Sequence, residues 1–166
     1  MDRFYLILGL PEDGGAISRE AVRAVVSREN KLLMVRTNWG SYSFPGGGVQ
    51  SGESHEEALC REVSEETGYV LSRVGDKLGE AIERRADRCD AGAVFYMESH
   101  YYQCEVSGVM TARQLEDYEA ALGLEAVWID LESALVANET LLNGTGHVHP
   151  WVYRETNVLK ELKRKG

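Results

Sequence analysis

A run of three glycines, Gly46–Gly48, lies six residues before the clearest helix signal in the chain. Ser54 and Glu57 have the spacing of a capping box, in which each side chain hydrogen-bonds the other residue's exposed backbone N–H. Gly68 suits the left-handed conformation that ends helices, so the pattern predicts a helix from Ser54 to Thr67. Because glycine lets backbone groups approach a ligand closely, the feature predicts a binding loop leading into a helix.

The predicted helix carries three glutamates on one face. At 100° per residue, Glu62, Glu65 and Glu66 fall within an arc of about 100°, where their charges repel unless a cation lies among them. Oxygen-rich sites of this kind suit Mg²⁺, Mn²⁺ and Ca²⁺. A solvated face stabilised by the pairs Glu57–Arg61 and Arg61–Glu65 is the alternative. The adjacent glycine loop favours the cation site, because its carbonyl oxygens can add ligands.

The spacing of these residues resembles the Nudix box, G-x(5)-E-x(7)-R-E-U-x-E-E-x-G-U, where U is a bulky aliphatic residue. The stretch from Gly47 to Tyr69 covers 23 of the 166 residues, and all seven fixed Gly, Glu and Arg positions of the box match. Tyr69 departs from the pattern, since it occupies the last aliphatic position. So many fixed residues at fixed spacing make a specific motif.

The resemblance implies a Nudix-type α/β/α sandwich with a mixed β-sheet, as a single Nudix hydrolase domain over residues 1–166. It implies Mg²⁺, with Mn²⁺ as an alternative, bound by Glu62, Glu65, Glu66 and the carbonyl of Gly46. Glu62 is also a candidate base in some members. Arg61 resembles the residue that orients the glutamates, and Glu53 a glutamate with a supporting or metal-linked role. The implied reaction is attack of water on a phosphorus atom of a nucleoside diphosphate linked to a variable group.

The rest of the chain mixes strands and helices without strict alternation, which favours an α/β sandwich over a doubly wound sheet. We expect a β-hairpin with a turn at Arg28–Asn30. The other expected strands are Phe4–Leu8, Tyr69–Val74, Ala93–Met97, Tyr101–Val106 and Ala126–Ile129. The other expected helices are Leu115–Leu122, Leu131–Ala137 and Pro150 to about Lys163.

The formal charge of −9 and a pI of about 5.0 argue against a groove for duplex DNA, which needs Lys and Arg to neutralise phosphates. A bridging cation would still let the chain bind a small phosphorylated nucleotide. Cys60, Cys89 and Cys104 form no zinc or disulfide pattern, so we expect buried thiols in a reducing, cytoplasmic setting. No stretch is apolar for long enough to span a membrane, and the start of the chain does not fit a signal peptide.

Outside the box, Glu125 is the first candidate for a further metal-binding glutamate from a facing loop, and Glu119 is the second. Trp39 is a candidate for stacking on a base. Arg84 and Arg85 are candidates for phosphate binding, together with Arg88. For each of these residues a plain surface or packing role is the alternative.

Three histidines are weaker candidates. His100 beside Tyr101 and Tyr102 fits a pocket lining, but one face of such a strand normally packs inward. The His147-x-His149 spacing resembles a metal motif, yet a site for Mg²⁺ would not favour nitrogen ligands.

By elimination among the family's other sequence signatures, the expected substrate is a nucleoside triphosphate, with an oxidised purine of the 8-oxo-dGTP type as one form. The alternatives are a nucleotide sugar, a dinucleotide or an RNA 5′ end. A non-catalytic nucleotide sensor is a different class; the intact box and the short stretch after Pro150, too short for a DNA-binding domain, argue against it. A homodimer is expected only by analogy with the family.

Overall fold

The computed structural model describes residues 2–9, 16–86 and 93–166. Within these residues, eight strands form one mixed sheet in the order β1-β6-β7-β2-β3-β4, with β5 paired to β2 and β8 paired to β3. The strands are β1 Phe4–Gly9, β2 Ala16–Arg28, β3 Lys31–Arg36, β4 Tyr42–Ser43, β5 Gly46–Gly48, β6 Tyr69–Ala86, β7 Val94–Met110 and β8 Glu125–Ile129. The helices are α1 His55–Thr67, α2 Asp117–Ala121, α3 Leu131–Leu142 and α4 Pro150–Lys165.

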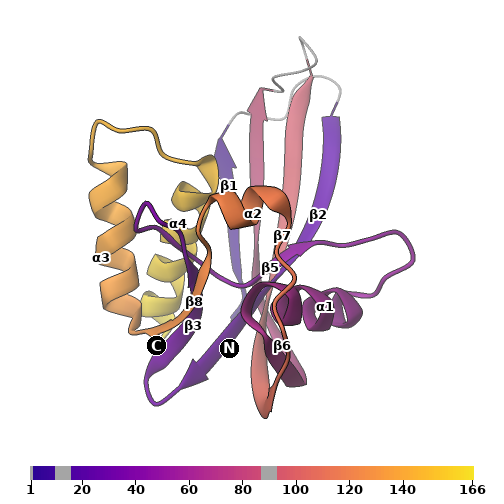
Figure 1. Cartoon of the computed structure of the whole chain (residues 1–166). Coiled ribbons are helices and arrows are strands. Elements are labelled where there is room, and N and C mark those ends of the chain that lie inside the picture. The colour runs from indigo at the N-terminus through magenta and orange to yellow at the C-terminus, as the bar shows by residue number, and fades with distance from the viewer. Residues whose placement is uncertain (1, 10–15, 87–92) are drawn as a thin grey trace.

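Helices cover both faces of the sheet, α1 on one face and α3 with α4 on the other (Figure 1). Alternate residues of β2 show the division, because successive side chains of a strand point to opposite faces. Val22 and Ala24 pack with Leu59 of α1 in one buried cluster. Val25 packs with Leu159 of α4 in the other. The α/β/α sandwich with a mixed sheet is therefore confirmed.

The predicted hairpin is present as β2 and β3. Glu29 and Asn30 have φ angles of 52° and 62°. Positive φ at two consecutive central residues is typical of a type I′ turn, whose twist matches the flanking strands. The predicted three-residue turn is thus a two-residue turn, and Arg28 belongs to β2.

The predicted break between Ala93–Met97 and Tyr101–Val106 was wrong, because β7 runs without interruption from Val94 to Met110. The intervening residues are polar, and two of them are buried: Ser99 is fully buried and His100 is 5% exposed. They pair in register with Ala81 and Glu80 of β6, which extends twelve residues beyond the predicted end at Val74. Pairing on both sides keeps these polar residues in the strand.

The box helix α1 has the predicted ends. Ser54 accepts a hydrogen bond from the backbone N–H of Glu57, whose side chain accepts one from the N–H of Ser54. Gly68 ends the helix with φ 78°. Tyr69, the departure from the box pattern, packs edge to face on Trp128 and its hydroxyl accepts a hydrogen bond of 2.9 Å from the indole N–H. An aromatic pair thus replaces the aliphatic contact.

The later helices follow the expected positions with different lengths. The helix expected over Leu115–Leu122 is the shorter α2, whereas α3 continues five residues past the predicted end at Ala137. Cys104 is buried as expected, but Cys60 is exposed on α1, and Cys89 lies outside the described residues. In the described ranges, no helix has the length and apolar character needed to cross a bilayer.

Candidate functional site

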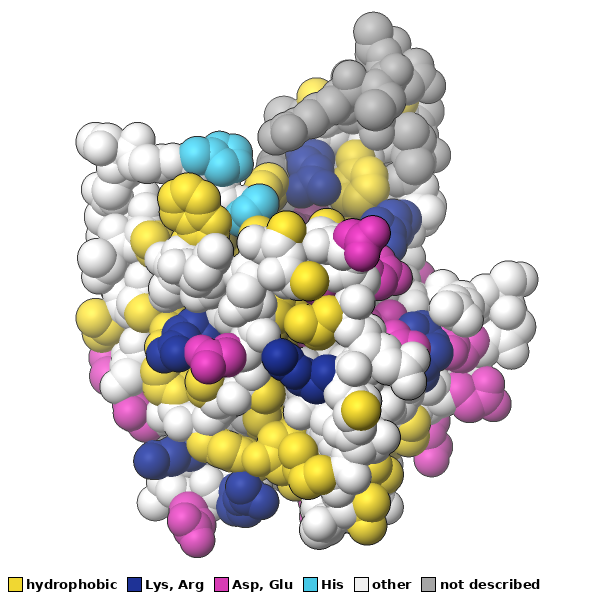
Figure 2. All heavy atoms as spheres, in the orientation of Figure 1, with side chains coloured by type: hydrophobic (Ala, Val, Ile, Leu, Met, Phe, Trp, Pro, Cys, Tyr) yellow, Lys and Arg dark blue, Asp and Glu magenta, His cyan; other side chains and the backbone are white. Residues whose placement is uncertain are grey.

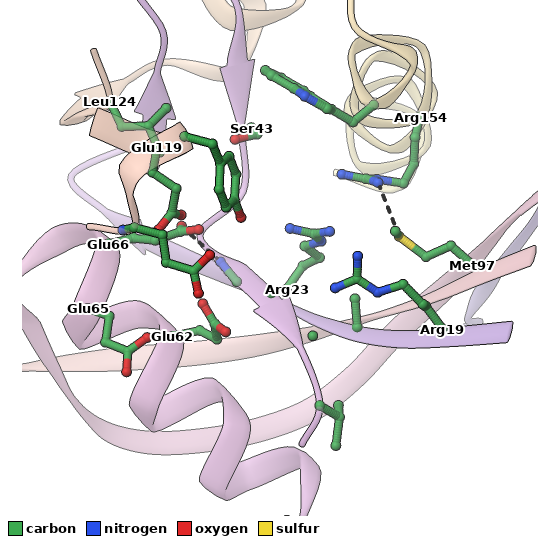
Figure 3. A pocket seen from close by; sticks show the side chains of 18 of the residues that line it. Arg19, Arg23, Ser43, Glu62, Glu65, Glu66, Met97, Glu119, Leu124 and Arg154 are labelled. Carbon is green, nitrogen blue, oxygen red and sulfur yellow. Dashed lines mark hydrogen bonds between the residues drawn. The ribbon is translucent and has the colours of Figure 1, made fainter. Parts of the chain in front are cut away.

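A cavity of about 420 Å³ opens between the glycine strand β5, the acidic face of α1, the region of α2 and the first turn of α4. Carboxylates line one side and guanidinium groups the other (Figure 3). On the molecular face shown in Figure 2, acidic and basic side chains are interspersed. The charged and aromatic residues that line the cavity include Arg19, Arg23, Glu62, Glu65, Glu66, Tyr118, Glu119, Trp151 and Arg154.

Glu66 is the most buried of the three α1 carboxylates on this wall, with 8% of its surface exposed. Its Oε2 accepts a hydrogen bond of 3.2 Å from the backbone N–H of Gly46. Burial raises the pKa of Glu66 well above its ordinary value, and the negative charges of Glu119 and Glu62 raise it further, while Arg23 lowers it. The site therefore holds carboxylates that are short of positive charge.

Glu62 lies against the glycine strand. A Cβ placed on Gly47 would lie 2.5 Å from the carboxylate carbon of Glu62, so only glycine leaves space for this side chain. Burial raises the pKa of Glu62, and a 2.7 Å ion pair with Arg61 opposes that shift. The glycine loop and the acidic face of α1 are thus in direct contact, as the sequence pattern predicted.

Arg61 connects the box residues to one another. Its Nε and Nη2 donate to the two oxygens of Glu53 at 2.7 and 2.8 Å, a bidentate pair. Its Nη1 donates to Glu62 at 2.7 Å and to Glu65 at 3.4 Å, and Nη2 also donates to the carbonyl of Gly48 at 2.9 Å. The Arg61 guanidinium lowers the pKa of Glu53 to about 2. Arg61 therefore fixes the position of both the helix carboxylates and the loop.

The opposite wall carries Arg19 and Arg23 from β2 and Arg154 from α4 (Figure 3). Arg154 is 2% exposed, and its two terminal nitrogens donate to Glu83 at 2.8 Å and to Glu155 at 3.0 Å. The Nε atoms of Arg23 and Arg154 are buried without a hydrogen-bond partner. Donors of this kind are rare in a folded protein, where buried polar groups are normally hydrogen-bonded.

The structure separates the two glutamates expected outside the box. Glu125 pairs with Arg36 at 2.5 Å on the outer strands, with 62% of its side chain exposed, and it does not line the cavity. Its strand was predicted well, but the antiparallel register of β8 on β3 places Glu125 beside Arg36. Glu119, the second candidate, is 7% exposed and lines the cavity beside the helix carboxylates.

Among the residues expected to bind substrate, only Arg85 lines this cavity, and its guanidinium lies 4.4 Å from the ring centroid of Phe95. Arg84 contacts the ring of Tyr96 and does not line the cavity. Trp39 is 67% exposed and lines a separate small cavity beside His147. Arg88 lies outside the described residues.

Two aromatic residues that were not among the sequence-based candidates, Tyr118 and Trp151, line the cavity, whereas Trp39 does not. Tyr118 comes from α2 and Trp151 from the first turn of α4. Neither has a local sequence signal, because both reach the cavity only through the packing of α2 and α4 around the sheet.

The donor set fits a hard divalent cation. Three glutamates of α1 and Glu119 converge on the glycine strand, and the shared burial of Glu62 and Glu66 raises the pKa of both carboxyl groups. A cation would remove this repulsion, and oxygen ligands are those that Mg²⁺ and Mn²⁺ prefer.

The amino-acid sequence matches the family model described as NUDIX domain over residues 17–152. Two curated relatives match over the box region. One is the "ADP-ribose pyrophosphatase" of Methanocaldococcus jannaschii, 39% identical over 54 residues, or 30% of this chain and 32% of that protein. The other is the Bacillus subtilis protein named "Putative 8-oxo-dGTP diphosphatase", 46% identical over 46 residues, or 27% of this chain and 31% of that protein. The chain spans about a third of the length of the curated relatives it matches.

Solved structures agree on the fold. A NUDIX hydrolase from Nitrosomonas europaea superposes with a TM-score of 0.57 at 21% identity, covering 89% of this chain and 90% of that one. A MutT NUDIX hydrolase from Burkholderia pseudomallei superposes with a TM-score of 0.52 at 19% identity, covering 85% and 97%. Because the family model matches residues 17–152, which are most of the chain, the chain belongs to the NUDIX domain family.

Proposed function

We propose that this protein hydrolyses a phosphoanhydride bond in a nucleoside diphosphate linked to another group, using a divalent cation. One observation carries the proposal: a wall of carboxylates faces a wall of guanidinium groups across a cavity of about 420 Å³. Guanidinium groups bind phosphate oxygens through paired N–H donors. Carboxylates on the other side can bind phosphate only through a cation, which also reconciles the substrate with a chain of net charge −9.

In this proposal Glu62, Glu65, Glu66 and the carbonyl of Gly46 hold Mg²⁺ or Mn²⁺, with Glu119 as a further carboxylate. When bound, such an ion neutralises phosphate charge and lowers the pKa of a nearby water. Arg61 and Glu53 do not contact the substrate and instead hold the glutamates in position through their ion pairs. Glu62 is our choice for the base, because its carboxylate lies directly against the glycine strand at the cavity and the box resemblance gives this position that role in some members.

The opposite wall binds the substrate. Arg19 and Arg23 neutralise the phosphates, while Arg154, already paired with Glu83 and Glu155, holds this side of the cavity in place. Tyr118 and Trp151 provide aromatic faces on which a nucleotide base can stack. Stacking favours a planar ligand and does not require a particular arrangement of its polar groups. Arg85 extends the basic wall.

For the substrate we propose a nucleoside triphosphate, with 8-oxo-dGTP as the first compound to test. The name of the Bacillus subtilis relative supports this compound. The name of the Methanocaldococcus jannaschii relative supports ADP-ribose as the second candidate, since it too contains a phosphoanhydride bond.

The test is a panel of dGTP, 8-oxo-dGTP, ADP-ribose and a nucleotide sugar with Mg²⁺ or Mn²⁺, in which released phosphate, pyrophosphate and nucleotide are measured separately. We expect turnover of at least one compound, lost in EDTA and strongly reduced in Glu65→Gln. Binding of a nucleotide without turnover of any compound would contradict hydrolysis and favour a sensor. Turnover that persists in EDTA would contradict the role of the cation.

A further inference from the structure

A second group of potential ligands lies on the sheet face covered by α1, outside the residues that line the acidic cavity. It consists of Glu20 on β2, His55 at the start of α1 and His100 on β7. One ligand atom of each residue lies within 4.8 Å of one ligand atom of the other two. The two imidazole rings are 4.7 Å apart between centroids. Three elements distant in sequence thus bring two imidazoles and a carboxylate together.

His100 is the buried member of this group. It is 5% exposed, and neither ring nitrogen has a hydrogen-bond partner. The carboxylates of Glu80 and Glu98 lie 3.3 Å from Nδ1 and 3.4 Å from Nε2, without the geometry of a hydrogen bond. An imidazole that is buried with neither nitrogen hydrogen-bonded is costly.

His55 is oriented by a neighbour. Its Nδ1 makes a 2.7 Å hydrogen bond with the hydroxyl of Tyr102, and its Nε2 contacts the carboxylate of Glu20. Metal-binding histidines usually bind the ion through one ring nitrogen and make a hydrogen bond through the other, which fixes the orientation of the ring. Both His55 and Glu20 keep part of their surface exposed, at 30% and 48% of the side chain, which leaves an entry path.

We propose that His55, His100 and Glu20 bind a divalent transition-metal ion of the zinc type. Two imidazole nitrogens and a carboxylate oxygen are ligands that Zn²⁺ accepts, whereas Mg²⁺ prefers oxygen alone. Bound zinc places its ligand atoms roughly 3.3–3.5 Å apart, which small rotations of the two exposed side chains achieve. Glu98 and Glu80 adjoin His100 and supply negative charge, and Lys77 holds Glu80 through a 2.6 Å ion pair.

A zinc ion at this site would stabilise the structure and would not take part in the chemistry of the cavity. It would connect the first residue of α1 to β2 and β7, and α1 carries the box glutamates at its other end. A bound ion would therefore fix the helix on the sheet and hold the carboxylate wall in place.

Zn²⁺ binding to the folded chain tests the proposal without any measurement of hydrolysis. All proteins carry Cys60→Ser, because this exposed thiol would also bind zinc. Equilibrium dialysis is done in millimolar Mg²⁺, which competes for the all-oxygen box site. Co²⁺ absorption in the visible range reports the ligand geometry. We expect one equivalent of Zn²⁺ in the parent protein, and affinity reduced about 10- to 100-fold in His55→Gln and in Glu20→Gln.

The matched control is His147→Gln. His147 belongs to the chain's other close histidine pair among the described residues, with its ring 5.6 Å from that of His149. This variant and Glu65→Gln should both keep the parent affinity. Zinc retained equally in His55→Gln and His147→Gln, or lost in Glu65→Gln, would overturn the assignment. Circular dichroism in EDTA verifies that each variant is folded.

Discussion

The carboxylate of Glu62 occupies the space that a side chain on Gly47 would need. A Cβ at position 47 would lie 2.5 Å from the carboxylate carbon and 2.6 Å from both oxygens. A Cβ atom and a carboxylate group do not tolerate that separation, so one of them would have to move. The two residues can be in their observed positions only because residue 47 is glycine. The absence of a side chain at Gly47 therefore links the glycine loop directly to the glutamate helix of the box.

Gly47→Ala is expected to displace Glu62 and reduce kcat by about 100-fold, the cost of moving a catalytic group by about 1 Å. Thermal unfolding should change far less, since the carboxylate can move toward the cavity. Gly108→Ala is the matched control, because a Cβ there meets no atom within 4 Å. Equal rates in the two variants would show that the position of Glu62 is not critical.

Glu119→Gln and Glu125→Gln form a pair that tests which glutamate outside the box belongs to the site. Glu119 is buried at the cavity, while Glu125 is exposed beside Arg36. We expect kcat to fall about tenfold or more in the first variant and to stay at the wild-type value in the second. The reverse pattern in steady-state kinetics would restore Glu125 to the site.

The ion pair of Glu53 with Arg61 predicts a pH dependence of stability. Because the pKa of Glu53 falls from 4.5 to about 2 in the folded protein, its contribution is fully present above about pH 4.5 and is lost as the pH falls through about 2. Glu53→Gln should therefore lower the free energy of unfolding at pH 6, with the difference from wild type shrinking toward pH 2. Denaturant titrations at several pH values measure it.

Glu105→Gln serves as the comparison for Glu53→Gln, since Glu105 makes an exposed 3.4 Å pair with Arg73. Pairs of that kind contribute about 0–1 kcal/mol. A Glu53 variant no less stable than this control would contradict the supporting role of Glu53.

Glu66→Gln should separate stability from activity. The buried carboxylate is destabilised by burial and by Glu119 and Glu62, and the amide keeps an oxygen acceptor for the N–H of Gly46. In EDTA we expect the variant to be more stable than wild type by roughly 1–3 kcal/mol. Hydrolysis should fall by orders of magnitude. Calorimetry with and without Mg²⁺ is the measurement, and wild type alone should gain stability from the ion.

Arg154→Met should destabilise the fold by about 3–5 kcal/mol, because it leaves Glu83 and the fully buried Glu155 without their cation. Arg73→Met removes an exposed cation and should cost less than about 1 kcal/mol. Urea unfolding compares the two variants. Similar losses would mean that the buried network does not depend on Arg154.

The features that the sequence predicted well are those set by neighbours along the chain. The capping box at Ser54, the stop at Gly68 and the turn at Glu29 and Asn30 each depend on a few adjacent residues. The acidic arc of α1 follows from helical geometry alone, so its three glutamates could be assigned to one face in advance.

The features that the sequence did not predict depend on register between distant strands. Glu125 directly precedes the predicted strand Ala126–Ile129 and is the first residue of β8, but its pairing opposite Arg36 could not be inferred from either segment. Trp151 reaches the cavity through the packing of α4, and the buried position of His100 follows from its pairing with Glu80 and Val22. Such long-range pairings have no local signal in the chain.

The alternation along β2 has a consequence for which insertions the chain can accept. Arg19 and Arg23 point to the cavity, whereas Glu20 and Val22 point to the face under α1. Adding or deleting a single residue within this strand would exchange the two sets, placing a carboxylate at the basic wall of the cavity and arginines beneath the helix. Insertions and deletions among relatives should therefore occur in turns and leave the length of β2 unchanged, because a single strand register places the side chains on both faces of the sheet.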